Sequence, residues 1–137
     1  MGYIAMPDST NPDPVQFVSA IPFQPTLDRL VNAIESAGMT LFARIDHAAG
    51  ARRVGMEMPP TVVLIYGNAK GGTPIMVATP LAALDLPLRV LVREDPNGHA
   101  VVSFHPIAPM LRHVGVPDAL ATRLEPAQRL LLDAIQS

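Results

Sequence analysis

An acid and a histidine, Asp46 and His47, stand side by side where an alternating stretch of the sequence ends. Histidine ionises near neutral pH, so His47 could act as a general acid or base, with Asp46 or Glu57 as its orienting carboxylate. Adjacent strand residues point to opposite faces, so Asp46 need not touch His47. The structural alternative, which we favour, is that His47 caps the next helix or bonds a buried carbonyl at the strand end.

A glycine-rich segment, Gly67 to Thr73, follows the apolar run 61–67. A Walker loop needs lysine directly before serine or threonine, whereas Lys70 precedes a glycine pair here. No G-x-G-x-x-G dinucleotide motif is present. What remains is a generic anion site, in which loop N–H groups and a helix start at Thr73-Pro74 converge. The alternative is a tight turn in which the glycines are needed only to adopt positive φ angles.

The leading functional hypothesis is a non-enzymatic module that holds a small anionic ligand. The strand face that carries Arg44 and Asp46 would form the floor of the pocket, and the glycine-rich segment would cover it. The predicted ligand-binding residues are Arg44, Gly67, Asn68, Lys70, Gly71, Gly72 and Thr73. An enzyme using His47, Asp46 and Glu57 is the second hypothesis, and a dimeric scaffold without a ligand is the third.

Other chemistries find little support in the sequence. The chain has no cysteine, which removes disulfides, thiolate catalysis and cysteine-type zinc sites. The remaining histidines, His99, His105 and His113, have no metal-binding spacing, so no metal site is predicted. No serine stands in a G-x-S-x-G context. The sequence indicates no particular cofactor.

The composition limits which binding partners and which cellular location we expect. Only 16% of residues are charged, below the usual value of about 25%, so contact with a second copy is expected. The net charge of −2 gives no electrostatic footprint for nucleic acid. No apolar run reaches about 18 residues, and residues 1–14 lack the pattern of a signal peptide, so we expect a soluble cytoplasmic protein. The low charge makes a homodimer the expected oligomer.

The elements that must position these residues alternate along the chain. Strands are expected at 15–23, 39–46, 61–67, 86–93 and 99–104, with a hairpin turn at 94–98. Thr26 is expected to cap a helix that ends at Gly38, and short helices are expected at 47–55, at 73–78 and after 106. This order predicts an α+β fold: a single mainly antiparallel sheet with helices packed on one face. Residues 1–14 would form a flexible lead-in and 15–137 a single domain.

Four stretches together resemble one family. They are "IDHAAGA" (45–51), "PPTVVLIYGNAKGGTPIM" (59–76), "LDLPLRVLVRED" (84–95) and "VSFHP" (102–106). The combination is similar to the bacterial and archaeal domain-of-unknown-function family 302. The resemblance implies a compact α+β domain with a TBP-like β-α-β(4)-α order, and it implies no established reaction. It also places Asp46, His47, Gly67, Asn68, Lys70, Gly72, Thr73 and Asp85 in the family's shared pattern.

Overall fold

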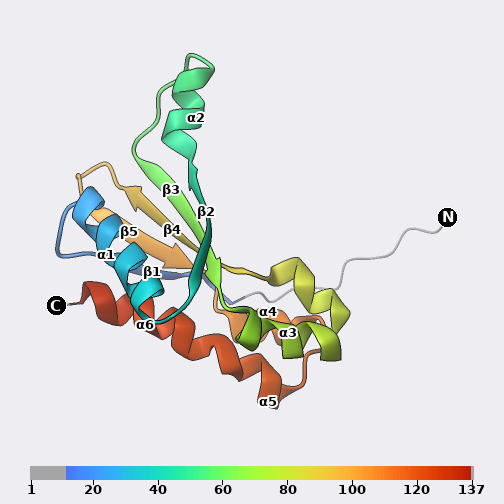
Figure 1. Ribbon diagram of the computed structural model, residues 1–137. Helices are drawn as coiled ribbons and strands as arrows, with labels where there is room; N and C mark the ends of the chain where they lie inside the picture. Colours follow the sequence, from blue (N-terminus) through green and yellow to red (C-terminus); the bar gives the residue numbers. More distant parts are fainter. Residues whose placement is uncertain (1–11, 137) are drawn as a thin grey trace.

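Five strands form one antiparallel sheet in the computed structural model, which describes residues 12–136 (Figure 1). Their order across the sheet is β1 (Val15–Val18), β5 (Ala100–Phe104), β4 (Leu88–Glu94), β3 (Thr61–Gly67) and β2 (Thr40–Asp46). The prediction of an α+β fold with a single antiparallel sheet is confirmed. The predicted lead-in lies outside the described residues except for 12–14, which form no helix or strand.

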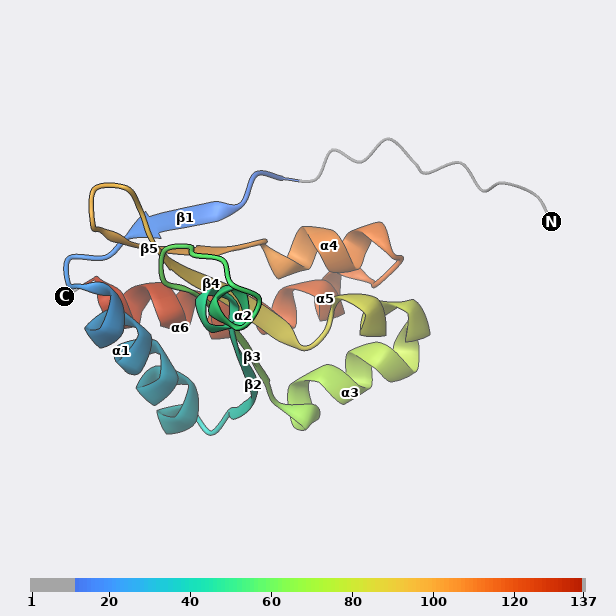
Figure 2. The same cartoon turned by 90° about the horizontal axis from the view of Figure 1, so that it is seen from above.

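Two long helices, α1 (Phe23–Ser36) and α6 (Glu125–Ile135), lie side by side and cover one face of the sheet (Figures 1 and 2). Their buried apolar side chains meet alternate residues of the central strands, such as Leu64, Val90 and Val92. Because successive side chains of a strand point to opposite faces of the sheet, every second residue contacts the helices. The core therefore lies between the sheet and this helix pair.

The shorter helices gather at the two ends of the sheet. At one end α2 (His47–Arg53) stands at the tip of the long β2–β3 hairpin (Figure 1). At the other end lie α3 (Ala69–Ala78), the 3-10 turn η1 (Pro80–Asp85), α4 (Ile107–His113), α5 (Asp118–Ala121) and the turn η2 (Thr122–Leu124). None of the helices within residues 12–136 is long and apolar enough to cross a membrane.

The start of the chain differs from the prediction in two ways. β1 ends at Val18, and α1 begins at Phe23, ahead of the predicted cap Thr26. Pro25 fits the first turn of a helix because N–H groups there have no partner within the helix. Thr26 is buried inside α1, and its hydroxyl lies 2.7 Å from the Ser19 hydroxyl. Thr26 therefore ties the helix to the end of β1.

A bulge interrupts the predicted alternation in β2. Leu41 is paired with Tyr66 and Ala43 with Ile65, so Phe42 is an extra residue between the two pairs. Leu41 packs against the core, whereas Ala43 pairs with a residue on the opposite face of the sheet. Leu41 and Ala43 therefore lie on opposite faces of the sheet, because a bulge shifts the period of a strand by one residue.

Candidate ligand pocket

The glycine-rich segment forms the first turns of α3. The Asn68 side chain accepts a hydrogen bond from the Lys70 N–H at 2.8 Å, and the Asn68 carbonyl accepts bonds from the N–H groups of Gly71 and Gly72. Asparagine is among the strongest N-cap residues, so the helix begins at Ala69 rather than at the predicted Thr73. These three N–H groups are already bonded and do not form an open anion cradle.

The glycines of α3 serve close packing rather than an unusual backbone. Neither Gly71 nor Gly72 has a positive φ, so the turn interpretation of the segment was also wrong. A Cβ added to Gly71 would lie 3.3 Å from the Leu124 side chain. The absence of a side chain therefore lets α3 approach η2 closely, and the two elements become opposing walls of a pocket.

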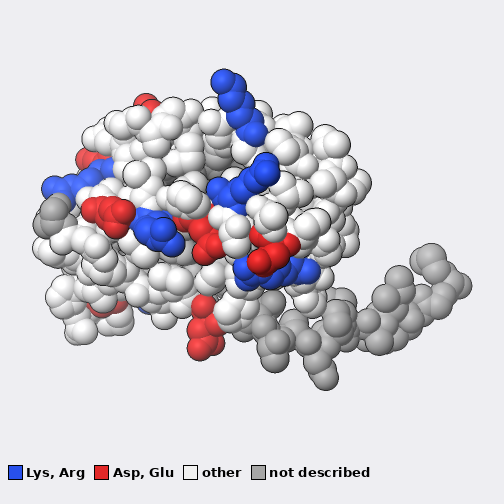
Figure 3. Space-filling model, turned by 90° about the horizontal axis from the view of Figure 1, so that it is seen from below, with Lys and Arg blue, Asp and Glu red and all other residues white. Residues whose placement is uncertain are grey.

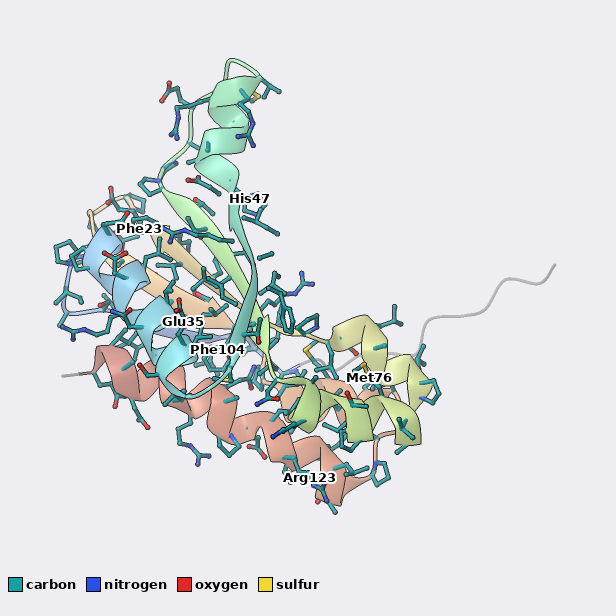
Figure 4. All side chains as sticks on the ribbon, viewed as in Figure 1. Phe23, Glu35, His47, Met76, Phe104 and Arg123 are labelled. Carbon is teal, nitrogen blue, oxygen red and sulfur yellow. The ribbon has the colours of Figure 1, made fainter. Side chains whose placement is uncertain are left out.

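This pocket, called the α3 pocket below, has a volume of about 420 Å³. Its walls come from the start of α3, the β2 bulge, the segment between η1 and β4, and the junction of η2 with α6. The lining residues are Met39, Phe42, Asn68, Ala69, Gly71, Gly72, Thr73, Met76, Leu86, Pro87, Leu88, Arg123, Leu124, Pro126 and Ala127. Figure 4 shows Met76 on the α3 side and Arg123 below it on the side of η2. Most of the lining is apolar.

Arg123 is the one charged residue among the described residues that line the α3 pocket. Its side chain is exposed and makes no hydrogen bond or ion pair within residues 12–136. A guanidinium offers several N–H donors in a planar fork that matches a carboxylate or phosphate. The pocket thus combines an apolar interior with a single unpaired cationic group.

The predicted ligand-binding residues are only partly brought together. Four of them, Asn68, Gly71, Gly72 and Thr73, line the α3 pocket. Gly67 lies behind its wall, where an added Cβ would be 3.7 Å from both Phe42 and Pro87. Lys70 is exposed outside the lining. Arg44 pairs with Leu64 beyond the bulge, so the predicted floor of Arg44 and Asp46 is wrong.

The acid–histidine pair is not assembled as a catalytic site. The Asp46 carboxylate accepts a hydrogen bond from the Ala49 N–H at 2.9 Å and so caps α2. His47 is exposed at the base of α2 (Figure 4), and Glu57 is exposed in the loop that follows. In the described part of the chain, no hydrogen bond joins these three residues. The cap of α2 is therefore Asp46, and not His47 as predicted.

Ligands for a metal ion do not converge in the described part of the chain. No group of three or more His, Cys, Asp or Glu side chains there is placed to hold an ion. The pocket lining likewise supplies aliphatic, thioether and guanidinium groups rather than a metal-binding set.

The family model described as "Domain of unknown function DUF302" matches residues 15–137. The chain belongs to the DUF302 family. Among solved structures, the crystal structure of the uncharacterised conserved protein DUF302 from Bacillus stearothermophilus aligns with a TM-score of 0.76 and 15% identity. It covers 89% of this chain and 94% of that chain, so the two share a fold.

Curated relatives match over a shorter stretch. Fluoride-specific ion channel FluC 1 of Brucella suis biovar 1 is 42% identical over 73 residues, which are 53% of this chain and 29% of that protein. Fluoride-specific ion channel FluC 2 of Brucella melitensis biotype 1 is 42% identical over 73 residues, with 27% of its length covered. The chain thus matches less than a third of the length of these relatives.

The sequence reasoning missed the residues that give the pocket its character. Phe42 enters it because of the bulge, and Arg123 reaches it from the far end of the chain. The only local signal was Phe42 itself, a large apolar residue two positions before Arg44 in an alternating stretch. No sequence pattern around Arg123 indicates a binding role, because nothing near it in the sequence shows that η2 packs against α3.

Proposed function

We propose that this DUF302 protein is a binding module for a small molecule with an apolar body and one anionic head group. The α3 pocket supports the proposal, since it pairs a mainly apolar lining with the unpaired guanidinium of Arg123. Its volume of about 420 Å³ lies within the range of small-molecule sites, about 300–1,000 Å³. An apolar pocket with few polar groups orients its ligand through those groups.

The recognition of the anion differs from that expected for a glycine-rich loop. The N–H groups of Lys70, Gly71 and Gly72 are engaged by Asn68, so the anionic head would pair with the Arg123 side chain instead. The glycines contribute by leaving space, since no side chain enters the pocket from that part of α3. A carboxylate suits this arrangement because it can accept two parallel N–H bonds from a guanidinium.

Octanoate and 1-octanol form a matched pair of probes for this proposal, because they share a chain and differ in the charged head. We expect isothermal titration calorimetry to show octanoate binding at least about tenfold tighter than 1-octanol, since a hydrogen bond to a charged group contributes about 1.5–3 kcal/mol. Arg123→Gln should abolish the difference. Arg129→Gln, an exposed arginine of α6 outside the α3 pocket, should leave it unchanged.

Gly72→Leu tests the apolar body of the ligand. An added Cβ at Gly72 would lie 3.7 Å from Met76 and 3.9 Å from Leu86, so a larger side chain there enters the pocket. Octanoate should then fail to bind while the variant stays folded by circular dichroism. Equal binding of octanoate and 1-octanol to the wild type, or binding that survives Gly72→Leu, would refute the proposal. Phosphate and fluoride belong in the same screen, fluoride because of the names of the relatives.

A second candidate function, self-association, is favoured by the face of the sheet opposite α1 and α6. This open face carries the partly exposed apolar residues Ile45, Val63, Ile65 and Leu91 on three neighbouring strands. The other side of the molecule, where α6 lies, carries charged side chains of both signs (Figure 3). We propose that two copies pair through their open faces to form a homodimer, and that the cysteine-free chain works in the cytoplasm.

Analytical ultracentrifugation tests the homodimer. Ile45 is 43% exposed on the open face, so Ile45→Lys should convert dimers to monomers without unfolding the chain. Val77→Lys is the matched control, because Val77 is 76% exposed on α3, away from that face. A wild-type monomer at high protein concentration would contradict this proposal, and so would a dimer that Ile45→Lys leaves intact.

A further inference from the structure

A second cavity, about 270 Å³ in volume, lies where the end of η1, the start of β4, the segment after β5 and α6 meet. It is lined by Leu84, Asp85, Leu88, Arg89, His105, Ile107, Met110 and Gln128, and shares only Leu88 with the α3 pocket. Asp85 and Arg89 come from the stretch 84–95 and His105 from the stretch 102–106. Two of the family-like stretches therefore meet at this cavity, which neither the α3 pocket nor the acid–histidine pair explains.

Arg89 of β4 and His105, the residue after β5, line the same cavity. The paired part of the two strands ends at Leu91 and Ser103, each two residues away along its strand. Asp85, the last residue of η1, lines the same cavity.

Gln128 holds the segment that carries His105. Its side-chain nitrogen donates a hydrogen bond to the His105 carbonyl at 2.8 Å, and its side-chain oxygen accepts one from the Ile107 N–H at 3.0 Å. Gln128 is only 6% exposed, so these bonds lie in a shielded environment where they are strong. The backbone on both sides of Pro106 is thereby fixed, and His105 is set at the edge of the cavity.

The charges of this cavity do not neutralise each other. Asp85 and Arg89 line the same space, yet neither makes an ion pair or a hydrogen bond within residues 12–136. A negative and a positive group that face one cavity without pairing match a ligand that carries both signs. The apolar part of the lining, Leu88, Ile107 and Met110, matches an uncharged side chain.

We propose that this cavity binds a small zwitterion of the α-amino-acid type with an apolar side chain. Arg89 pairs with the carboxylate, Asp85 pairs with the ammonium group, and His105 offers a further hydrogen bond. Arginine suits the carboxylate because its planar fork allows two parallel bonds.

Three probes separate the two charges of the ligand. L-leucine carries both groups, leucinamide lacks the carboxylate, and 4-methylpentanoate lacks the ammonium group. In the Arg123→Gln background, where the α3 pocket has lost the group that pairs with a carboxylate, we expect calorimetry to show L-leucine binding at least tenfold tighter than either analogue. Arg89→Gln should remove the preference over leucinamide, and Asp85→Asn should remove the preference over 4-methylpentanoate. Each variant should leave the other preference in place, a crossed pattern that loss of folding would not produce.

Two control variants keep the test specific. Arg93→Gln changes an arginine on the same face of β4 outside the cavity and should leave L-leucine binding unchanged. Arg129→Gln changes an exposed arginine of α6 outside both cavities and should also leave it unchanged. The proposal is overturned if L-leucine gives no signal at about 10 mM, a concentration that reveals a Kd near 1 mM. It is also overturned if either the Asp85 or the Arg89 variant binds L-leucine as the wild type does.

Discussion

The Tyr66 hydroxyl donates a hydrogen bond to the backbone carbonyl of Ala127, with 3.2 Å between the oxygens. The bond joins the end of β3 to the first turns of α6, two segments far apart in sequence. Tyr66 is fully buried, and this burial raises the pKa of its hydroxyl above the ordinary range. Because Ala127 lines the α3 pocket, the same contact holds one wall of that pocket in place.

Tyr66→Phe should lower the free energy of unfolding by about 1 kcal/mol at neutral pH, because the Ala127 carbonyl loses its donor. The two proteins should also differ in alkali. In the folded wild type Tyr66 keeps its proton, whereas in the unfolded chain it ionises near its ordinary pKa of 10.0. Ionisation favours the unfolded state, so wild-type stability should fall as the pH rises above 10.

Urea denaturation from neutral pH to above pH 10 measures this difference. The Phe variant lacks the ionisable hydroxyl, so its stability should decline less steeply over that range. A wild-type curve that runs parallel to that of the variant would show that Tyr66 is not shielded from solvent as the structure indicates.

Gln128→Leu should destabilise the fold by about 2–4 kcal/mol, because it leaves the Ile107 N–H and the His105 carbonyl without partners. Urea denaturation measures the change. Gln24→Leu is the control, since Gln24 bonds Asp28 on an exposed helix face, where such pairs contribute only about 0.2–0.5 kcal/mol. A loss no larger than that of the control would mean that water replaces the Gln128 amide.

Gly72→Ala should stabilise the protein by up to about 1 kcal/mol, since alanine is the better residue within a helix and the added Cβ has only ordinary contacts. Gly98→Ala should do the opposite, with a cost of about 1–2 kcal/mol, because Gly98 has a φ of +83° in the β4–β5 turn. Thermal melts of the two variants measure the contrast. If both were destabilised, the Gly72 site would be more tightly packed than these distances indicate.

The sheet and its helices could be predicted because their signals are local. The apolar run 61–67, the turn at 94–98 and the apolar spacing of residues 27–34 each fix an element through its own residues. The short turn at 94–98 also indicates that β4 and β5 pair as an antiparallel hairpin, whereas helical connections separate the other successive strands. The bulge at Phe42 could not be predicted in the same way, because it depends on how β2 is matched to β3.

The start of α3 shows where two local signals compete. Thr73-Pro74 has the residues of a helix start, and glycines before it favour a loop. Asn68 also has the residue type of a cap, and its side chain and carbonyl bond three N–H groups. The earlier cap wins because the helix it starts packs Ile75 into the core and Gly71 against Leu124. Packing of this kind cannot be inferred from the segment alone.

The candidate sites depended still more on distant parts of the chain. Half of the α3 pocket comes from residues after 84, and Arg123 has no sequence motif around it. Nothing in the sequence connects Asp85 with His105, and their meeting at one cavity depends on the packing of η1 beside α4. The sequence instead suggested Asp46 and His47 as a catalytic pair because they are neighbours in the chain, although no hydrogen bond joins their side chains.

Asp95 gives the β4–β5 turn a stability that depends on pH. Its carboxylate accepts hydrogen bonds from the N–H groups of His99 and Asn97, both at 2.9 Å. The bond from His99 is the main cause that lowers the pKa of Asp95 below its ordinary value of 3.8. The folded state therefore prefers the ionised form, so the stabilisation is present above pH 3.8 and is lost as the pH falls through the lower pKa of the folded protein.

Asp95→Asn isolates the charge, because the amide keeps one oxygen that can accept the same N–H groups. We expect the variant to be less stable than the wild type at neutral pH, since hydrogen bonds to a carboxylate are stronger than those to a neutral oxygen. The difference in unfolding free energy between the two proteins should disappear in acid, once the wild-type carboxyl is protonated. Urea denaturation from pH 7 down to below the ordinary pKa of Asp95 measures this difference. A gap that stays constant over that range would show that the oxygen, and not its charge, stabilises the turn.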